Sequence, residues 1–488
     1  MSKEKLHILC LLLFISCSVR AQVIDFPQQQ DSVDIVFYAK KNAWEAGLQN
    51  FSLNMGIWGF NRFIMNESFA RINIHTIKKN LSHPFVWDND MMSTNMFAHP
   101  YHGNLYFNSA RSQGFNYWKS GLFAFGGSAM WELFLENEYP SFNDIIATPI
   151  GGMALGEVLY RTSDLVFDDR QSGLPRLGRE LAGFLIAPTR GLTRLLNGDA
   201  WRVRATSGRQ FGTPDISVEV SAGVRALELK GEIFDEGVGT ATYIGIEYGD
   251  RFADENEKPY DYFTLRSNVN IQNSQPGLGQ LNILGRLYVR ELADTKNHFL
   301  SLGFYQHFDY YDSDTISDIS TEIPYKFCTP ASIGIGFIYR LKSAKNVHFD
   351  AFIHANTILL GGALSDYYEI DDRNYNLASG FSAKAGFNTN YKDKISLSGN
   401  YEIYRMYTWK GYPQDIDWNN IDIREFNYQG DLSNAILYTS SLKMDIRLTK
   451  ILFLTGMICN YTRYTNYSYF DNVFSHTWEG KFMITCKL

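Results

Sequence analysis

Beyond about residue 215, apolar and polar residues alternate along the chain with a period of two. In the stretch 216–225 every second position is apolar, and the same alternation closes the chain over 481–488. Because successive side chains of a strand point to opposite faces, this pattern predicts strands with one apolar and one polar face. About twelve such segments follow one another, near 215–225, 240–249, 260–272, 279–291, 297–308, 329–341, 346–357, 376–389, 393–406, 434–448, 450–461 and 471–488.

A membrane β-barrel and a soluble β-sandwich both produce such alternation. Many segments reach about ten residues, the length that a tilted strand needs to cross the hydrocarbon layer. Links between them alternate between short and long, as tight periplasmic turns and long outer loops do. Aromatic residues gather at segment ends, for example Tyr310, Tyr311 and Trp409, as in the girdles of membrane barrels. We therefore predict an α+β membrane protein with a C-terminal antiparallel transmembrane β-barrel of about twelve strands over 206–488.

The part ahead of the barrel has a different pattern, with spaced apolar residues that favour helices. Proline and capping residues predict helices over 101–114 and from Ser141 toward 168. The apolar stretch 117–134 carries Lys119 and Glu132, and charges are costly within a membrane span. We therefore expect a buried helix there, within a helical region over 22–205 that is periplasmic or plugs the barrel.

The amino terminus predicts export. Two lysines precede an apolar run over 8–15, and Val19-Arg20-Ala21 follows as a cleavage site, so residues 1–21 are predicted to be a signal peptide. A lipoprotein modified at Cys17 is the alternative. Export and a barrel together predict the outer membrane of a Gram-negative cell, with outer-membrane lipid, lipopolysaccharide and the barrel-assembly machinery as partners.

Composition narrows the function classes. After cleavage the chain keeps Cys328, Cys459 and Cys486, too few and too far apart for a disulfide framework or a metal site. The net charge of -7 without a basic tract argues against nucleic acid as a partner. No cofactor and no metal are predicted.

An ordered series of motifs runs through the helical region. It comprises His99-Pro100-Tyr101-His102-Gly103, Tyr106, Ala110-Arg111, Gly114, Trp131-Glu132, Glu136, Pro140-Ser141-Phe142-Asn143-Asp144, Thr148-Pro149, Gly151-Gly152 and Gly156-Glu157. Over roughly 60–200 this series resembles the outer-membrane family catalogued as domain of unknown function 3943. The resemblance implies an outer-membrane location and a helical region followed by a barrel. It names no catalytic residue.

The candidate catalytic residues are His99, His102, Glu132, Glu136 and Asp144. Buried carboxylates need partners, and two interpretations are open. Histidines and carboxylates that meet between helices would form an acid–base or metal site; ion pairs that hold the helices together are the structural alternative. The His99-x-x-His102 spacing lacks the i,i+4 pattern of a zinc helix.

Three local patterns have simpler structural explanations. A variant capping box with Ser141 explains Asp144. Gly152-x-x-x-Gly156 indicates close helix packing. Glu157 and Arg161 are four apart, and we expect a surface ion pair.

Arginines are concentrated in the helical region, with eight and no lysine between 161 and 204. Guanidinium groups bind phosphate or carboxylate in paired fashion. The candidate ligand-binding residues are Arg111, Arg161, Arg176 and Arg179, either for lipopolysaccharide phosphates or as anchors to lumen acids such as Glu219, Glu247 and Glu402.

Three functions follow from these patterns. The first is a non-catalytic role in envelope transport, lipid handling or structural support. The second is an outer-membrane enzyme that acts on lipid or glycan through the carboxylates and histidines. The third is a passive pore. Carboxylates each bound to an arginine would favour support, whereas carboxylates and histidines that converge at a lipid-accessible site would favour the enzyme.

Overall fold

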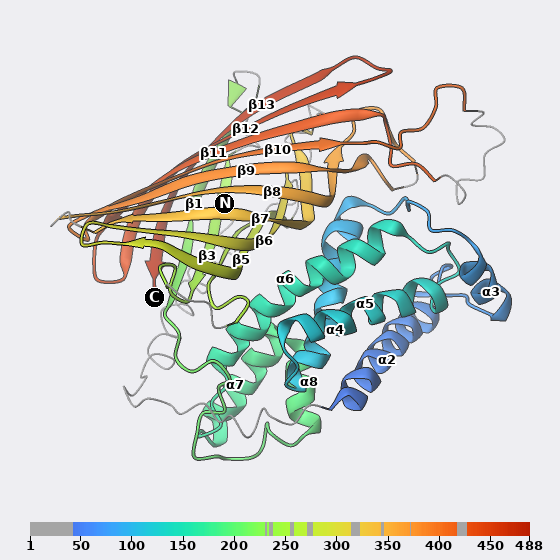
Figure 1. Ribbon diagram of the computed structural model, residues 1–488, viewed down its shortest axis with the longest axis horizontal. Coiled ribbons are helices and arrows are strands. Elements are labelled where there is room, and N and C mark those ends of the chain that lie inside the picture. The colour runs from blue at the N-terminus through green and yellow to red at the C-terminus, as the bar shows by residue number, and fades with distance from the viewer. Residues whose placement is uncertain are drawn as a thin grey trace.

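The structure is a computed structural model in which a group of helices precedes a single β-sheet (Figure 1). It describes residues 42–229, 232–233, 238–253, 258–270, 277–313, 323–342, 346–370, 372–416 and 427–488. The predicted signal peptide over 1–21 lies outside these residues.

The helices begin at polar caps that the sequence supplies. Asn42 and Asn116 each accept a hydrogen bond from a backbone amide of the first turn, at 3.2 and 2.9 Å, and Asn73 forms a capping box with Thr76. Such caps satisfy amides that have no partner within the helix. The elements are α2 (Ala43–Phe60), η2 (Asn61–Met65), α3 (Ile74–Ser82), η3 (Thr94–Ala98), α4 (His99–Ser112), α5 (Tyr117–Phe134), α6 (Phe142–Val166), α7 (Gly173–Ile186) and α8 (Pro188–Leu196).

The strands form an antiparallel barrel. The short β2 pairs only with β1, and the other twelve strands close into a ring when β13 pairs with β1. The predicted barrel of about twelve strands is therefore confirmed. The strands are β1 (Ile216–Leu229), β2 (Glu232–Ile233), β3 (Gly239–Tyr248), β4 (Phe263–Val269), β5 (Leu278–Asp294), β6 (His298–Asp312), β7 (Lys326–Leu341), β8 (Val347–Leu364), β9 (Tyr375–Tyr391), β10 (Ile395–Tyr407), β11 (Ser433–Arg447), β12 (Leu452–Tyr467) and β13 (Val473–Lys487).

Ion pairs identify the face of the sheet that lines the lumen. Arg266 on β4 meets Glu402 on β10 at 3.5 Å, and Lys384 on β9 meets Asp309 on β6. Strands that are not neighbours can make such contacts only through the interior of the barrel. The alternate positions face outward and are apolar and exposed in much of the wall, for example Ile335, Phe337, Ile353, Phe381, Leu442, Ile458 and Phe482.

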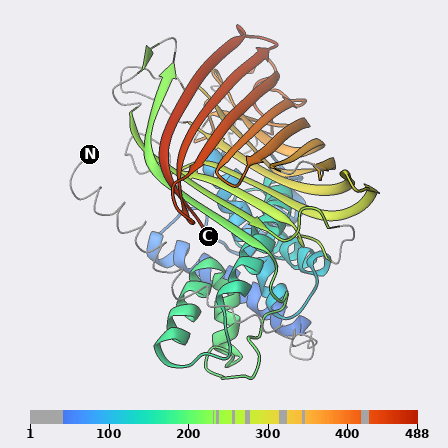
Figure 2. The same cartoon turned by 90° about the vertical axis from the view of Figure 1, so that its left-hand side faces the viewer.

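The helices pack against the outer wall of the barrel. Phe308 and Tyr310 flank the lumen residue Asp309, so they face outward, and they share a buried apolar cluster with Tyr106 and Phe107 of α4. The long helix α6 lies against β5, β6, β7 and β8. Figure 2 shows the helices gathered on one side of the barrel.

The expectation that the helices plug the barrel is therefore wrong for the helices that the structure describes, whereas a periplasmic position stays a prediction. The physical reason is an apolar patch on the wall itself, which these helices cover. Gln306 also faces outward, and its side-chain amide donates to the carbonyl oxygen of Ile150 in α6 at 2.9 Å. Alternation along a strand predicts an apolar outer face but does not distinguish contact with lipid from contact with another part of the chain.

Two helices touch backbone to backbone because glycines meet at their crossing. A Cβ atom added to Gly103 of α4 would lie 1.8 Å from the carbonyl oxygen of Thr148 in α6, and one added to Gly152 would lie 2.4 Å from the carbonyl carbon of Gly103. A Cβ at Gly156 would lie 2.6 Å from the ring of Phe107. The Gly152-x-x-x-Gly156 motif thus packs against α4, as its spacing predicts.

The helices carry many exposed apolar residues. Leu122 on α5 is 70% exposed and Leu185 on α7 is 78% exposed. The helix 117–134, expected to be buried, therefore buries only one face. Within the described residues, no helix combines the length and the apolar character needed to cross a membrane.

Candidate functional site

The five candidate catalytic residues come from three consecutive helices and the links between them. His99 and His102 lie in the first turn of α4, and Glu132 lies near the end of α5. Glu136 follows α5 by two residues, and Asp144 lies in the first turn of α6. Because α4 crosses both α5 and α6, these side chains lie close together at one end of the helices. We call this group the acid–histidine cluster.

The histidines contact the other helices directly. The Nε2 atom of His99 lies 3.7 Å from a carboxyl oxygen of Asp144. The Nε2 atom of His102 lies 2.8 Å from the hydroxyl of Tyr106, and its ring meets the indole of Trp131 edge to face, with centroids 5.2 Å apart.

The two glutamates form a carboxyl pair whose outer oxygens have fixed donors. The backbone amide of Ser141 donates to Glu132 at 2.9 Å, and the indole of Trp131 donates to Glu136 at 3.1 Å. The two carboxyl groups are also hydrogen-bonded to each other. Such contact requires a proton between them, because two touching carboxylates cannot both be ionised.

Only one of the two hydrogen bonds of the predicted capping box between Ser141 and Asp144 is present. The hydroxyl of Ser141 does accept a hydrogen bond from the Asp144 amide at 3.2 Å. The amide of Ser141, however, donates to Glu132 and not to the Asp144 carboxyl. That carboxyl is instead hydrogen-bonded to Asp88 and to the side-chain amide of Asn143. Capping therefore does not explain why an acid stands at this position.

Burial keeps the cluster largely uncharged at neutral pH. It raises the pKa of Glu132 to about 8 and holds the pKa of Glu136 well above its usual range, assisted by the negative charges of neighbouring acids. Burial also raises the pKa of Asp144, which Asp88 raises further. The pKa of His102 falls to about 3 through burial and the nearby His99. The site thus holds protons on its acids and has neutral imidazoles.

The acid–histidine cluster reaches the surface of the helical region. His99, His102 and Glu136 are half-buried, whereas Glu132 and Asp144 are buried. Exposed apolar or aromatic residues close to these positions in the sequence are Met91, Tyr101, Phe134 and Phe142, and the acids Asp90 and Glu138 are exposed beside them. We call the four apolar and aromatic residues the apolar rim.

The candidate ligand-binding arginines are occupied by acids of the helical region itself. Arg111 binds both oxygens of Glu157 at 2.7 Å, and Arg161 binds the same carboxylate at 2.9 Å. Glu157 is 0% exposed, so the expected surface pair of Glu157 and Arg161 is wrong. Burial alone would raise the pKa of Glu157, but the two guanidinium groups lower it below its usual value.

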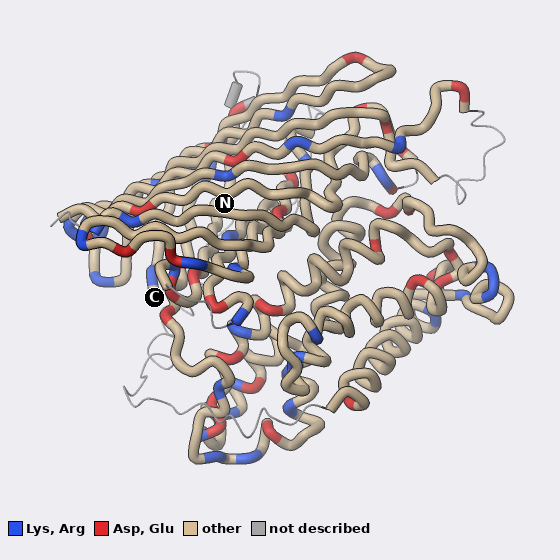
Figure 3. Tube along the Cα trace, in the orientation of Figure 1, with Lys and Arg blue, Asp and Glu red and all other residues tan. Residues whose placement is uncertain are grey.

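The remaining two candidates also have internal partners. Arg176 binds Asp169 at 2.9 Å and Glu180 at 2.7 Å, and Arg179 donates to the carbonyl oxygen of Val166 at 3.0 Å. Figure 3 shows basic and acidic segments interleaved around α7 and α8. The arginines thus anchor the helices to one another. None of the four contacts the expected lumen acids Glu219, Glu247 or Glu402 among the interactions of the described residues.

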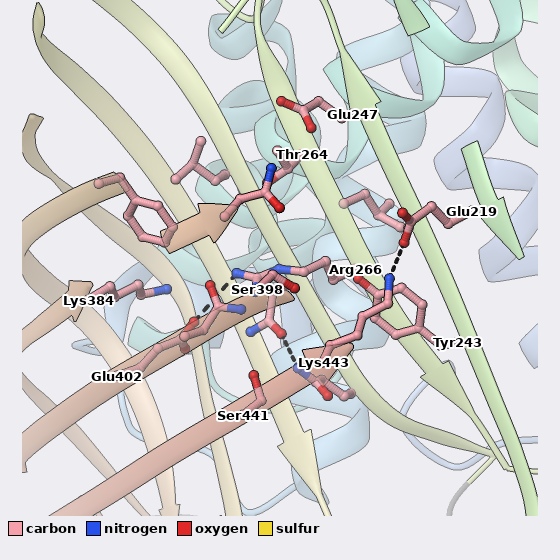
Figure 4. Close-up of a pocket in the computed structure, with 18 of the residues that line it drawn as sticks. Glu219, Tyr243, Glu247, Thr264, Arg266, Lys384, Ser398, Glu402, Ser441 and Lys443 are labelled. Carbon is pink, nitrogen blue, oxygen red and sulfur yellow. Dashed lines mark hydrogen bonds and ion pairs between the residues drawn. The ribbon is translucent and has the colours of Figure 1, made fainter. Parts of the chain in front are cut away.

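The barrel lumen contains a second candidate site, which sequence reasoning missed. A cavity of ≈ 320 Å³ lies among inward-facing residues of the strands (Figure 4). Its charged lining is balanced between five acids and five bases: Glu219, Glu247, Asp309, Glu402, Asp445, Arg251, Arg266, Lys384, Lys443 and Lys487. Alternation indicated which of these face inward, but only the closed barrel brings residues of distant strands together.

The lumen charges are paired with one another. Lys487 binds Glu219 and Asp445, each at 2.7 Å, and Lys443 binds Glu219 (Figure 4). Glu402 accepts a hydrogen bond from Tyr311 at 2.8 Å beside its ion pair with Arg266. Each charge therefore has a counter-charge within reach.

Metal binding has no support in either site. Among the residues that the structure describes, no three His, Cys, Asp or Glu side chains are arranged to hold a metal ion. The protons on the carboxyl pair give the acid–histidine cluster groups that can exchange protons.

Comparison with known families supports the resemblance seen in the motifs. Residues 84–189 match the family model described as Domain of unknown function (DUF3943). The match covers α4, α5, α6 and α7 completely, and so includes the whole acid–histidine cluster. The barrel follows it in the chain, as expected.

Solved structures similar to this chain include outer-membrane channels. The NanC porin is 10% identical, with 55% of this chain and 98% of that chain covered and a TM-score of 0.26. The Pseudomonas putida toluene transporter TodX is 9% identical, with 56% and 89% covered and a TM-score of 0.21. The outer membrane channel DcaP of Acinetobacter baumannii is 6% identical, with 56% and 96% covered and a TM-score of 0.24. A search of curated proteins gave no match. These similarities agree with a barrel fold and support nothing finer.

Proposed function

We propose that this protein is an outer-membrane barrel that takes up a small polar solute carrying both a positive and a negative charge. The observation that carries the proposal is the lumen cavity, whose five acids and five bases are paired with one another. Its volume of ≈ 320 Å³ suits a small molecule.

The outer face of the barrel supports the membrane location. Strands such as β5, with 17 residues, and β8, with 18, exceed the length needed to cross the hydrocarbon layer. Outward positions of the barrel wall are apolar, for example Ile353 of β8 at 57% exposure and Phe482 of β13 at 58%. Water would be a poor solvent for such a surface, whereas lipid is a good one.

The pairing of the lumen charges explains the preference for a solute with both charges. A solute with one charge can bind only by separating an ion pair, which leaves the other partner buried without a counter-charge. A zwitterion can offer its carboxylate to Arg266 and its ammonium group to Glu402, so both partners stay neutralised. The described helices pack on the outer wall, and none of their residues lines the cavity.

Liposome swelling tests this proposal. Protein reconstituted in liposomes should admit glycine, a zwitterion, several-fold faster than sodium acetate or methylammonium chloride. The variant Glu402→Gln should lose most of this preference, because residue 402 then has no negative charge to bind the ammonium group of the solute while Arg266 binds its carboxylate. The matched control is Lys450→Ala in the exposed turn between β11 and β12, which should behave as the parent protein. Glycine uptake no faster than in protein-free liposomes would overturn the proposal.

A further inference from the structure

We propose that the acid–histidine cluster is a catalytic site that hydrolyses an acyl bond of a lipid in the outer membrane. The carboxyl pair of Glu132 and Glu136 would exchange the protons, and His99 and His102 would orient the reacting groups. This activity goes beyond the proposed transport, since it uses another part of the molecule, and shares with it only the membrane location.

The absence of cations around the pair separates it from the structural acids of the same region. Glu157 is bound to two arginines. Among the described residues, neither Glu132 nor Glu136 forms an ion pair with any lysine or arginine, and Asp144 pairs only with His99. A carboxylate that merely holds helices together would be expected to have a cationic partner. Burying these acids without a cation lowers the stability of the fold, and a role in holding the helices together does not explain why they are kept.

A buried amide beside the pair has an unused hydrogen-bonding atom. The side-chain nitrogen of Asn80 donates to the backbone carbonyl oxygen of Glu136 at 3.0 Å. Its side-chain oxygen is buried and has no hydrogen-bond partner. A buried acceptor without a donor costs free energy, and a water molecule or a substrate hydroxyl beside this segment would supply the donor.

The surroundings select the class of bond. No arginine or lysine forms an ion pair with Glu132, Glu136 or Asp144 among the described residues, so no cation would neutralise the charge of a bound phosphate group. A neutral ester or amide carbonyl carries no such penalty. The apolar rim of Met91, Tyr101, Phe134 and Phe142 favours an acyl chain next to that carbonyl. An acylated lipid fits both features.

The chemistry needs only water as a second reactant. The ionised carboxyl of the pair takes a proton from water while the water oxygen bonds to the acyl carbon and the carbonyl π electrons move to oxygen. Those electrons then reform the carbonyl, the bond from the acyl carbon to the leaving oxygen or nitrogen breaks, and the protonated carboxyl gives that atom its proton. The products are a fatty acid and an alcohol or amine. Two carboxyls that share one proton can perform both transfers.

The experiment measures fatty-acid release by the full-length mature protein. Vesicles of phosphatidylethanolamine with lipopolysaccharide serve as the probe, and released fatty acids are quantified by mass spectrometry. Glu132→Gln and Glu136→Gln should each lower the rate by about a hundredfold or more. Both amides can still accept the hydrogen bonds from Ser141 and Trp131, so the fold is retained. The control Glu138→Gln changes an exposed acid of the same segment and should leave the rate unchanged.

A pH profile distinguishes catalysis from a structural role. The rate should rise as the pH approaches about 8, where Glu132 loses its proton and can accept one from water while Glu136 keeps its own. The titratable groups around the pair are Asp88, Asp90, His99, His102, Tyr106 and Asp144. The proposal is overturned if the parent protein releases no more fatty acid than empty vesicles, or if both Gln variants keep the parent rate. Glycine uptake by the same preparations reports on the transport proposal independently.

Discussion

Two buried glutamates of the helical region show opposite electrostatic behaviour. Burial would raise the pKa of Glu157, but two arginines lower it; burial raises the pKa of Glu132 to about 8, and no cation offsets it. Ionised Glu157 therefore stabilises the fold, whereas ionisation of Glu132 destabilises it. Sequence spacing could predict that both lie on helices. It could not predict their partners, since Arg111 is 46 residues from Glu157.

The raised pKa of Glu132 predicts a pH-dependent stability. Between its ordinary value of 4.5 and about 8, the folded chain keeps a proton that the unfolded chain has lost. Raising the pH through this window therefore lowers the free energy of unfolding. Glu132→Gln removes the titration. We therefore expect the free energy of unfolding of the variant, minus that of the parent, to be about 1–3 kcal/mol larger at pH 8 than at pH 5. Urea unfolding of the helical signal in circular dichroism measures this difference. An equal pH dependence in both proteins would contradict the prediction.

The crossing of α4 and α6 is the element that builds the acid–histidine cluster. Gly103 and Gly152 bring the two backbones into contact, and this contact places His99 beside Asp144. Gly152→Ala must separate the helices, which costs about 1–3 kcal/mol through overpacking. We expect fatty-acid release to fall at least tenfold while glycine uptake through the barrel persists.

A glycine that touches nothing provides the matched control for this crossing. A Cβ atom at Gly126 of α5 would have nothing within 4 Å. Gly126→Ala should therefore stabilise α5 by up to about 1 kcal/mol through helix propensity and leave both activities intact. Loss of fatty-acid release in this variant, or its persistence in Gly152→Ala, would show that the crossing does not position the site. The motif Gly152-x-x-x-Gly156 predicted close packing, but only the structure identifies α4 as the partner.

At the scale of the whole molecule, the sequence predicts the barrel better than it predicts the position of the helices. A strand exposes its period-two pattern wherever it lies, so alternation alone was enough to predict about twelve strands. The position of the helical region depends on contacts such as Phe308 with α4 and Gln306 with Ile150, which join segments more than 150 residues apart in the chain. The lumen cavity has the same origin, because Arg266 and Glu402 meet only once the ring is closed.

The position of the helices on the outer wall predicts that they share the membrane with the barrel. Lipid would otherwise occupy this flank, and the helical surface that replaces it exposes Leu122 and Leu185. Cysteines introduced at these two positions and labelled with an environment-sensitive fluorophore should show blue-shifted emission that lipid-borne nitroxides quench. The native cysteines of the described residues are buried and should not react. A fluorophore on Lys450→Cys, in an exposed turn, should show the emission expected in water, and the nitroxides should not quench it.

Water-like emission at both leucine positions would place the helices outside the bilayer. Protection of the fluorophore from the quencher that increases with protein concentration would instead assign this face to contact between two copies of the chain. Because the acid–histidine cluster opens beside an apolar rim on this same helical region, only lipid contact gives it access to an acyl chain without extraction from the membrane.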